Sequence, residues 1–264
     1  MIDPAARFTR ALVCPPAASF ANGLTHADLG PPDLALARVQ HAAYVEALRR
    51  LGIAVTELPA DPAYPDSTFV EDTAIVTAKG AILCRPGAPS RSGEVYSMHA
   101  ALERLLGHEV PSITEPGTVD GGDICQAGTH VFIGLSARTN DAGADQLARW
   151  LHGKGYTAST VSIRNDPALL HLKSGLTWLG GTQLLVVPAL ANRAGFSDHH
   201  LTVTAPGEEY AANAVLANGV VLMAEGYPDT VARVAALGHR VVTLEMSEFR
   251  KMDGGLSCLS IRVP

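Results

Sequence analysis

Short apolar strands recur along the chain, and a polar residue opens each of them. The openings lie at Asp72 (EDTAIV), Asp123 (GDICQAG), Lys173 (LKSGLTWLGG), Asn213 (ANAVLANG) and Cys258 (SCLSIRV), at intervals of 51, 50, 40 and 45 residues. After the first four openings, a turn that contains glycine leads into a second strand, which is the pattern of a β-hairpin. The hydrophobic pattern therefore predicts five strand-rich units, of which the last carries a single strand.

Helical periodicity fills the spaces between these units. Residues 32–52 place apolar side chains at helical spacing and end at Gly52, with two arginines in the last turn. The same pattern occurs in three further segments, 92–107, 137–155 and 228–238. Strands and helices therefore alternate, and the pattern predicts an α/β fold.

A repeat of this length is typical of radial or stacked architectures. The stretch ARFTRALVCP (6–15) could pair with the last strand and close a ring that has no open edge. We therefore expect a closed α/β ring of about five units. We also expect a single domain over residues 1–264, because no linker or low-complexity segment divides the chain. A doubly wound parallel sheet would alternate in the same way, but no GxGxxG turn follows the first strand to support it.

Composition narrows the classes of partner. The 264 residues are 47% hydrophobic and 17% charged, with a formal net charge of −6 and no block of like charges. This balance argues against nucleic acid or an anionic membrane as the main partner. No signal-peptide pattern is visible, and the longest apolar runs are too short to span a bilayer. The four cysteines lack metal-binding spacing, so we expect a reduced, cytoplasmic protein without disulfides or structural zinc.

Polar side chains are concentrated at or near the unit openings, and a ring would gather them at its centre. Burying such groups without partners is costly, so their clustering favours a functional site. These residues are Asp66, Glu71, Asp72, Asp120, Asp123, His171, Lys173, Asn213, Asp253 and Cys258.

Cys258 is the candidate nucleophile. It follows MDGGLS and precedes a strand, so it lies in a polar turn that contains glycine and is held by a rigid element. A reactive thiolate needs such access together with nearby positive charge. The alternative is a small buried hydrophobe, which suits Cys14, Cys84 and Cys125 because they lie within apolar strands or at their ends.

The histidines allow two interpretations. His171 lies between leucines, a position that is also typical of a hydrogen-bonded core histidine. His199 and His200 follow an aspartate and could ligate a metal, but no further ligand stands at a recognisable spacing, which favours a surface loop. Asp120 and Asp123 flank two glycines, which is also the pattern of a simple turn.

The segment PDSTFVED packs three carboxylates into seven positions among apolar residues. On a strand, Asp66 and Asp72 would share one face and Glu71 would lie on the other. A solvated loop is a poor explanation for all three. Arg91 and Arg138 each precede a predicted helix, although arginines there are also common as surface residues.

Eight stretches are more specific in combination than any one of them is alone. They are NGLT (22–25), PDSTFVED (65–72), RPGAPSRSGE (85–94), TVDGGDI (118–124), FIGLSARTN (132–140), LHLKSG (170–175), YAAN (210–213) and EFRKMDGGLSC (248–258). In order and over nearly the whole chain, they resemble the dimethylarginine dimethylaminohydrolase family of the guanidino-group-modifying (pentein) superfamily. The resemblance implies a pseudo-fivefold, propeller-like ring of five ββαβ units, in agreement with the observed rhythm.

The resemblance also implies an activity. The family hydrolyses Nω-methylated arginines, such as asymmetric dimethylarginine and monomethylarginine, to citrulline and dimethylamine or methylamine. By this resemblance, Cys258 attacks the guanidinium carbon and forms a covalent thiouronium intermediate. His171 protonates the departing amine and then activates water, and Asp120 orients His171.

Substrate contacts follow from the same resemblance. Asp66, Glu71 and Asp72 would form an acidic floor for the guanidinium nitrogens. Arg91 and Arg138 would clamp the α-carboxylate of the substrate.

The other end of the substrate would meet Leu24 and the backbone at Met252, which match positions near the α-amino group. The segment 19–30 would then be a mobile lid with Gly23 and Gly30 as hinges. We expect a small cationic substrate, no nucleic-acid or membrane partner and no cofactor, and we leave a homodimer open.

Four alternatives remain at this point. Arginine deiminases are longer and carry an extra helical domain, and agmatine deiminases act on a substrate without a carboxylate for two arginines to hold. A non-catalytic binding protein would not need Cys258 and His171 intact. A metal hydrolase built on His199 and His200 would lose activity on chelation and not on thiol alkylation. Zinc would otherwise act only as an inhibitor at Cys258 and His171.

Overall fold

The computed structural model describes residues 6–264, so residues 1–5 of the predicted domain lie outside the described range. Within that range the strands form five separate small sheets and no closed barrel. In the first sheet, β1 (Arg10–Val13) lies between β14 (Ile261–Val263), with which it pairs antiparallel, and β2 (Ala54–Glu57), with which it pairs parallel. The predicted pairing of the N-terminal stretch with the last strand is therefore confirmed.

Each of the other four sheets begins with one of the predicted hairpins, and three of them add a third strand that is parallel to the second. The strands are β3 (Ala74–Thr77) and β4 (Gly80–Leu83); β5 (Ile124–Ala127), β6 (His130–Leu135) and β7 (Thr157–Ser162); β8 (Leu176–Gly180), β9 (Gln183–Val186) and β10 (His200–Val203); and β11 (Val215–Ala217), β12 (Val220–Ala224) and β13 (Arg240–Leu244). The β3–β4 hairpin has a single parallel bridge, Leu83 to Ser112, in place of a third strand.

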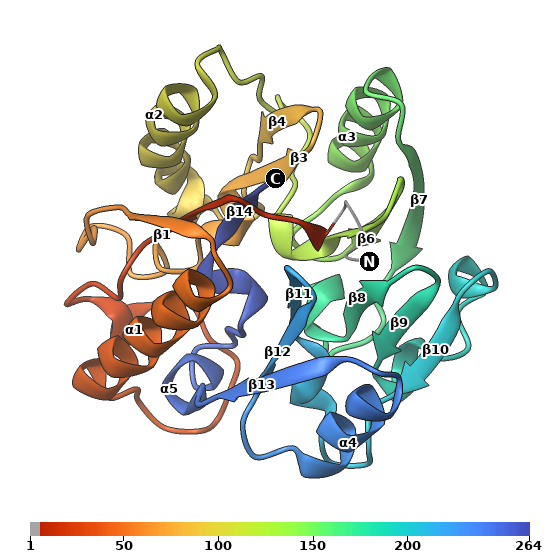
Figure 1. Ribbon diagram of the computed structural model, residues 1–264. Coiled ribbons are helices and arrows are strands. Elements are labelled where there is room, and N and C mark those ends of the chain that lie inside the picture. Colours follow the sequence, from red (N-terminus) through yellow and green to blue (C-terminus); the bar gives the residue numbers. More distant parts are fainter. Residues whose placement is uncertain (1–5) are drawn as a thin grey trace.

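The four predicted helices are present and lie around the outside of the sheets (Figure 1). They are α1 (Leu34–Arg50), α2 (Val95–Leu106), α3 (Asp141–Gly153) and α4 (Pro228–Ala236), and a short α5 (Ser247–Arg250) follows. Helices α1, α2 and α3 begin two to four residues later than the pattern predicted. A 3₁₀ turn at Pro89–Glu94 precedes α2, and the Asn140 side chain accepts the Gly143 N–H and so caps α3.

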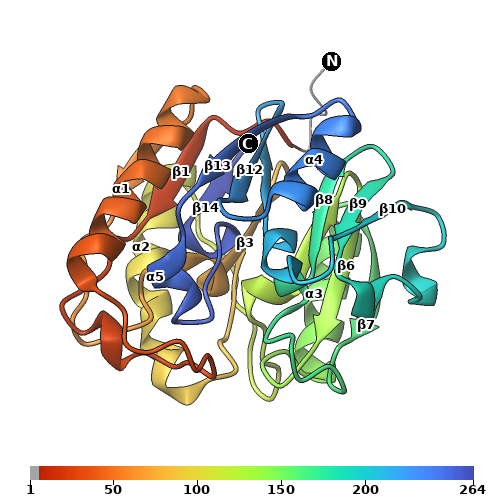
Figure 2. The ribbon, with the colours of Figure 1, turned by 90° about the horizontal axis from the view of Figure 1, so that it is seen from below.

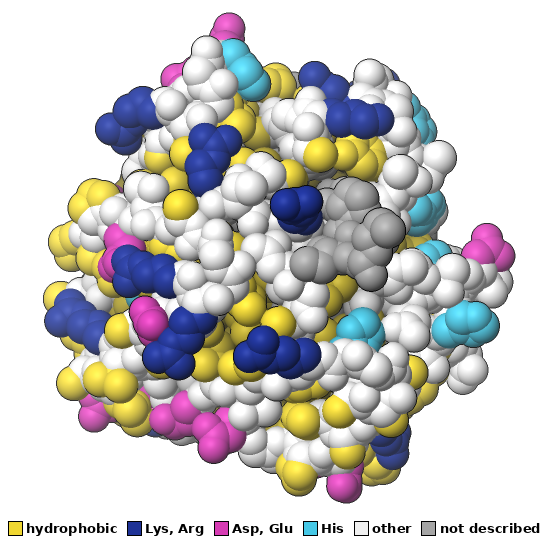
Figure 3. Space-filling model, in the orientation of Figure 1, with side chains coloured by type: hydrophobic (Ala, Val, Ile, Leu, Met, Phe, Trp, Pro, Cys, Tyr) yellow, Lys and Arg dark blue, Asp and Glu magenta, His cyan; other side chains and the backbone are white. Residues whose placement is uncertain are grey.

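Apolar side chains fill the spaces between helices and sheets. Helix α1 lies beside β1 (Figure 2) and buries Tyr44 and Leu48, while the Tyr44 hydroxyl lies 2.7 Å from the Ser260 hydroxyl ahead of β14. No helix in residues 6–264 combines the length and the apolar character that a bilayer crossing needs. On the face shown in Figure 3, lysines and arginines are dispersed between uncharged and hydrophobic atoms.

Five short 3₁₀ turns carry the polar openings into one place. They are Val70–Thr73, Gly121–Asp123, Leu172–Ser174, Glu209–Ala212 and Ser257–Leu259. The first four contact one another in chain order, and the last contacts the first. Asn213 joins the remaining pair, because its Oδ1 accepts the Ser257 N–H at 2.9 Å. Residues about fifty positions apart in the sequence therefore meet at the centre of the turns.

Candidate active site

One pocket brings together most of the residues that the sequence singled out. Asp66, Asp72, Arg91, Arg138, His171 and Cys258 line it, together with Leu24, Phe69, Leu170, Met252, Asp253 and Gly254. Two residues to which the resemblance assigned a role do not line it, and neither do Asp123, Lys173 and Asn213. Asp120 lies directly behind His171, and Glu71 lies on the far side of the turn that carries Asp72.

The turn that carries Cys258 packs closely against its surroundings, and the two glycines before it make this approach possible. A Cβ at Gly254 would collide with the Phe69 ring, and one at Gly255 would lie 2.5 Å from Cγ of Asn213. Both glycines are needed for this close packing. Cys258 itself is only 8% exposed, so its surroundings are more enclosed than the polar sequence suggested.

The Cys258 thiol is protonated in the empty site. Burial raises the pKa of Cys258, and the negative charges of Glu71 and Asp72 raise it further, to about 12. Lys173 acts in the opposite direction but more weakly. A thiolate at this position therefore needs an additional positive charge beside it.

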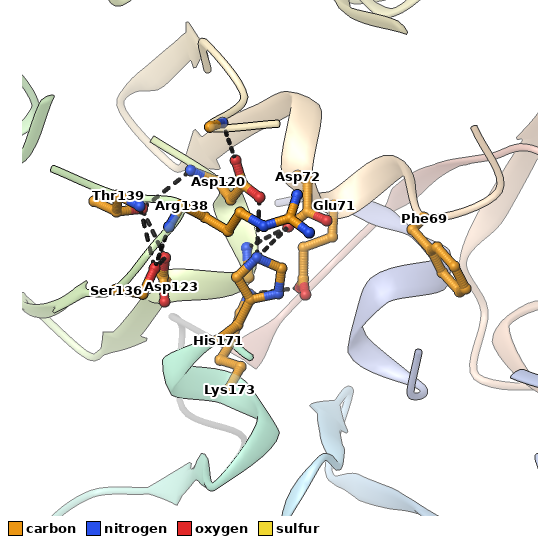
Figure 4. Close-up of polar contacts among 12 residues, drawn as sticks. Phe69, Glu71, Asp72, Asp120, Asp123, Ser136, Arg138, Thr139, His171 and Lys173 are labelled. Atoms are coloured by element: carbon orange, nitrogen blue, oxygen red, sulfur yellow. Dashed lines mark hydrogen bonds and ion pairs between the residues drawn. The ribbon is translucent and has the colours of Figure 1, made fainter. Parts of the chain in front are cut away.

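His171 is held by a carboxylate, that of Asp120, which is the residue that the resemblance implied. Its Nε2 lies 3.0 Å from Oδ2 of Asp120 and 3.9 Å from Oδ1 of Asp72 (Figure 4). Burial lowers the pKa of His171, but the charge of Asp72 and the hydrogen bond to Asp120 outweigh burial and raise the pKa to about 9. A Cβ at Gly122 would lie 2.7 Å from the imidazole Nδ1, so the glycine lets the ring pack against the backbone. The site thus holds an imidazolium that can donate a proton near neutral pH.

Three carboxylates line the pocket, Asp66, Asp72 and Asp253, and the first two are those that the resemblance implied for the guanidinium. Both oxygens of Asp66 accept the Leu24 N–H, at 3.1 and 3.2 Å, and burial raises the pKa of Asp66. Asp72 accepts from Arg91 Nη1 at 2.5 Å and from the Gly122 N–H at 2.8 Å. Although burial opposes ionisation, the charges of His171 and Arg91 lower the pKa of Asp72 to about 2. Asp72 is therefore a fixed negative charge in the pocket.

Glu71 does not join this floor, contrary to the role that the resemblance implied. Its Oε2 accepts from the Ser257 hydroxyl at 2.7 Å, and its Oε1 pairs with Lys173 at 2.5 Å and with Arg262 at 3.3 Å. These residues line a separate cavity of about 150 Å³. Neighbouring residues in two turns thus point in opposite directions, Glu71 and Ser257 into this cavity and the residues after them into the pocket.

The two predicted arginines differ. Arg91 is 5% exposed, and its guanidinium bonds Asp72, both oxygens of Glu94 and the carbonyl oxygens of Asp66 and Phe69. These contacts use all of its nitrogens within the protein.

Arg138 is half-buried at the pocket wall, and among residues 6–264 its guanidinium has no hydrogen-bond partner. Figure 4 shows its side chain extending toward Asp72 and His171. Arg138 is thus the arginine with donors free for a ligand, and the geometry favours it over Arg91 as the group that would hold a carboxylate.

The predicted lid is fastened over the pocket at two points. Leu24 bonds Asp66 through its N–H, and its side chain is 40% exposed. Beyond it, the Thr25 hydroxyl lies 2.9 Å from the Lys251 carbonyl oxygen and 3.3 Å from Oδ2 of Asp253, and that Oδ2 accepts the His26 N–H at 2.5 Å.

The candidate hinges of this segment differ. A Cβ at Gly23 would collide with the Asp66 carboxylate, so this glycine permits a close approach, whereas Gly30 has a left-handed φ of 76°. The mobility of the segment stays a prediction.

The sequence missed two buried acids that support the site. Glu94 holds Arg91, and the spacing of the two residues (i, i+3) in a turn was the available signal. Asp123 appeared among the polar openings without a role, yet it is fully buried and accepts three hydrogen bonds.

One group within residues 6–264 has the geometry of a metal site, and it comprises Asp72, Asp120 and His171, whose ligand atoms lie within 4.8 Å of one another. Asp72 is paired with Arg91 and Asp120 with His171, and a protonated imidazole cannot coordinate a metal ion. His199 and His200, the basis of the metal-hydrolase alternative, belong to no such group in the described part of the chain.

Comparisons with known proteins agree with this geometry. The model of the arginine deiminase family matches residues 60–211. The N(G),N(G)-dimethylarginine dimethylaminohydrolase of Pseudomonas aeruginosa is 42% identical over 94% of this chain and 96% of its own. A structure of a cysteine-to-serine mutant of the P. aeruginosa enzyme with citrulline superposes with a TM-score of 0.94, at 41% identity over 97% of this chain and 99% of that one.

A second dimethylarginine dimethylaminohydrolase structure is a histidine-to-glycine mutant as an adduct with S-methyl-L-thiocitrulline. It superposes with a TM-score of 0.93 and 41% identity, over 97% of this chain and 99% of that one. The α/β architecture described above is therefore the pentein fold of these enzymes. By sequence and by structure, the chain belongs to the dimethylarginine dimethylaminohydrolase family.

Proposed function

We propose that the protein hydrolyses Nω-methylated arginines to citrulline and methylated amines, with Cys258 as the nucleophile. The observation that carries this proposal is the shared pocket of a thiol, a carboxylate-held imidazolium and two carboxylates. The carboxylates suit a cation, and the thiol and imidazolium suit nucleophilic attack with protonation of a leaving amine.

Two carboxylates and one free arginine define how the substrate would bind. Asp66 and Asp72 hold the guanidinium nitrogens, and Arg138 holds the α-carboxylate. Arg91 acts on the substrate chiefly through Asp72, whose charge it fixes. The α-amino end meets Leu24 and the backbone at Met252, beneath the segment 19–30.

The reaction then proceeds in two halves. As the cation binds, the thiol proton leaves to solvent, and the sulfur of Cys258 forms a bond to the guanidinium carbon. His171 gives its proton to the methylated nitrogen, the C–N bond breaks, and the amine departs from a covalent thiouronium. Neutral His171 next takes a proton from water, whose oxygen attacks the same carbon. The C–S bond then breaks, the proton of the new hydroxyl group passes to the departing sulfur, and citrulline is released together with the regenerated Cys258 thiol.

Further properties belong to the same proposal. The chain is a single catalytic domain, and its five sheets form a pseudo-fivefold ring of ββαβ units that β1 and β14 close. The mutual contacts of the five 3₁₀ turns support this ring. The reaction needs no cofactor, and zinc would inhibit by binding Cys258 and His171. We place the enzyme in the cytoplasm and leave a homodimer open.

The decisive test offers dimethylarginine, monomethylarginine and arginine separately and measures citrulline together with the amine that is released. We expect citrulline and methylated amine in equal amounts, and no product from Cys258→Ser. Ammonia and citrulline from arginine alone would instead assign the protein as an arginine deiminase. Loss of activity on chelation, with resistance to thiol alkylation, would exclude Cys258 as the nucleophile.

A further inference from the structure

We propose that Asp123 is a positioning residue for this reaction, because its buried carboxylate fixes both the loop that carries Arg138 and the backbone that carries His171. The inference rests on the proposed function for the roles of those two residues. Asp123 is the last residue of the 3₁₀ turn that precedes β5, is 0% exposed and does not line the pocket.

One oxygen of Asp123 holds the His171 side of the site. Its Oδ1 accepts the Leu172 N–H at 2.9 Å, and this peptide is the one that follows His171. A Cβ at Gly134 would lie 2.7 Å from the Leu172 Cβ and 2.9 Å from that same oxygen. The glycine in β6 thus leaves room for this hydrogen bond, which sets where the His171 backbone stands.

The other oxygen holds the Arg138 side. Oδ2 accepts from the Ser136 hydroxyl at 2.6 Å and from the Thr139 hydroxyl at 2.7 Å (Figure 4). It therefore binds the two residues that flank the Ala137–Arg138 pair. The Ser136 oxygen in turn accepts the backbone N–H of Arg138 at 2.9 Å. Asp123 therefore determines the path of the loop from which the Arg138 side chain extends.

The donor and acceptor roles in these hydrogen bonds also affect Asp120, a third residue of the site. Each hydroxyl has one proton, and both protons go to Asp123, so the hydroxyl oxygens are left to accept. The Thr139 oxygen uses this capacity for the N–H of Asp120, at 3.1 Å. An acceptor-only carboxylate thus orders the whole network, and an asparagine amide cannot replace it. The NH₂ group of asparagine is a donor, and it would face either the Leu172 N–H or one of the two hydroxyl groups. The N–H or O–H that it faces would then have no acceptor.

The test compares Asp123→Asn with Asp145→Asn, which removes the same charge at an exposed position on α3. Steady-state kinetics with dimethylarginine should show a lower kcat and a higher KM in Asp123→Asn, with at least about a tenfold loss of kcat/KM from one unmatched buried hydrogen bond. Asp145→Asn should match the wild type. Ser136→Ala should mainly raise KM, and Thr139→Val should mainly lower kcat, because these hydroxyls reach Arg138 and Asp120 respectively.

A readout without substrate separates this inference from the proposed function. Amide hydrogen exchange at Leu172, Arg138 and Asp120 should accelerate in Asp123→Asn and stay unchanged in Asp145→Asn, whatever reaction the enzyme catalyses. If the wild type fails to hydrolyse methylated arginines, the proposed function fails and the exchange result still decides the role of Asp123.

Two outcomes overturn the inference. The first is unchanged kcat and KM in folded Asp123→Asn, and the second is exchange at Leu172, Arg138 and Asp120 that either stays unchanged or accelerates no more than in the rest of the protein. If Asp123→Asn does not fold, wild-type kinetics in both Ser136→Ala and Thr139→Val would overturn it as well.

Discussion

Cys258 should become a thiolate only when a cation occupies the pocket beside it. Lysine and citrulline form a matched pair of ligands for this prediction. Both carry the α-amino and α-carboxylate groups of the proposed substrate and neither should be consumed, but only lysine has a charged side chain. Adding lysine should therefore raise the thiolate fraction, and adding citrulline should not.

The expected magnitude follows from the pKa of Cys258 in the empty site, which is about 12. Near pH 8 that pKa leaves about one thiol in ten thousand ionised. A positive charge at roughly 4 Å from the sulfur, at an effective dielectric constant of about 20, stabilises the thiolate by about 4 kcal/mol. This is roughly a thousandfold change in the ionisation equilibrium, so about one thiol in ten should ionise near pH 8 with lysine bound.

The thiolate can be measured by its ultraviolet absorbance during a pH titration. Burial raises the pKa of both Cys14 and Cys125 to about 11, and that of Cys84 also well above its ordinary value, so these thiols stay protonated near pH 8. A difference spectrum against Cys258→Ser removes what they contribute. Equal absorbance with lysine and with citrulline, or a thiolate already present without ligand, would refute the reasoning.

Three further predictions concern the other groups of the site. His171→Ala should suppress both halves of the reaction, and a burst of amine from a covalent intermediate that accumulates would show that only water activation is lost. Arg138→Ala should raise KM at least about tenfold and change kcat little, because the arginine contacts a group remote from the reacting carbon; a fall in kcat alone would contradict the clamp. The folded-state pKa of His171 is raised to about 9, so its stabilising contribution is complete below its unfolded pKa of about 6.5 and is lost as pH rises through 9. Urea unfolding of wild type and His171→Gln at several pH values should show their difference in free energy shrink over that window, and a constant difference would exclude the linkage.

The hairpins were predictable because their pattern is local and strong, and the closing pair was predictable because the last unit carries a single strand that needs a partner. Buried strands such as β9 and β12 are continuous apolar runs, and glycine marks the turns between partners. The hydrophobic pattern did not predict the parallel third strands, which only the ββαβ units of the resemblance implied. Strand β2 has no buried residue, and only one of the six residues of β7 is buried. Edge strands of this kind carry almost no hydrophobic signal, and long-range pairing with a buried neighbour decides their conformation.

The sequence predicted only some of the contacts among polar residues. The rhythm of the openings placed Asp72, His171 and Cys258 in equivalent units, and the turns do bring them to one pocket. The repeat could not predict contacts with residues that lie outside the unit openings. The ion pair between Arg91 and Glu94, for example, depends on side-chain positions that spacing does not determine.

For Glu71, the prediction from local geometry and the role implied by the family resemblance disagree. Alternation along the chain put Asp66 and Asp72 on one face and Glu71 on the other, and the side chains lie on those two sides although the segment is a 3₁₀ turn and not a strand. The resemblance instead assigned Glu71 to the floor of the pocket. Its carboxylate still acts on the chemistry, because its negative charge raises the pKa of Cys258 from behind the nucleophile. Glu71 therefore strengthens the dependence of the thiolate on a bound cation, and it does so without touching the substrate.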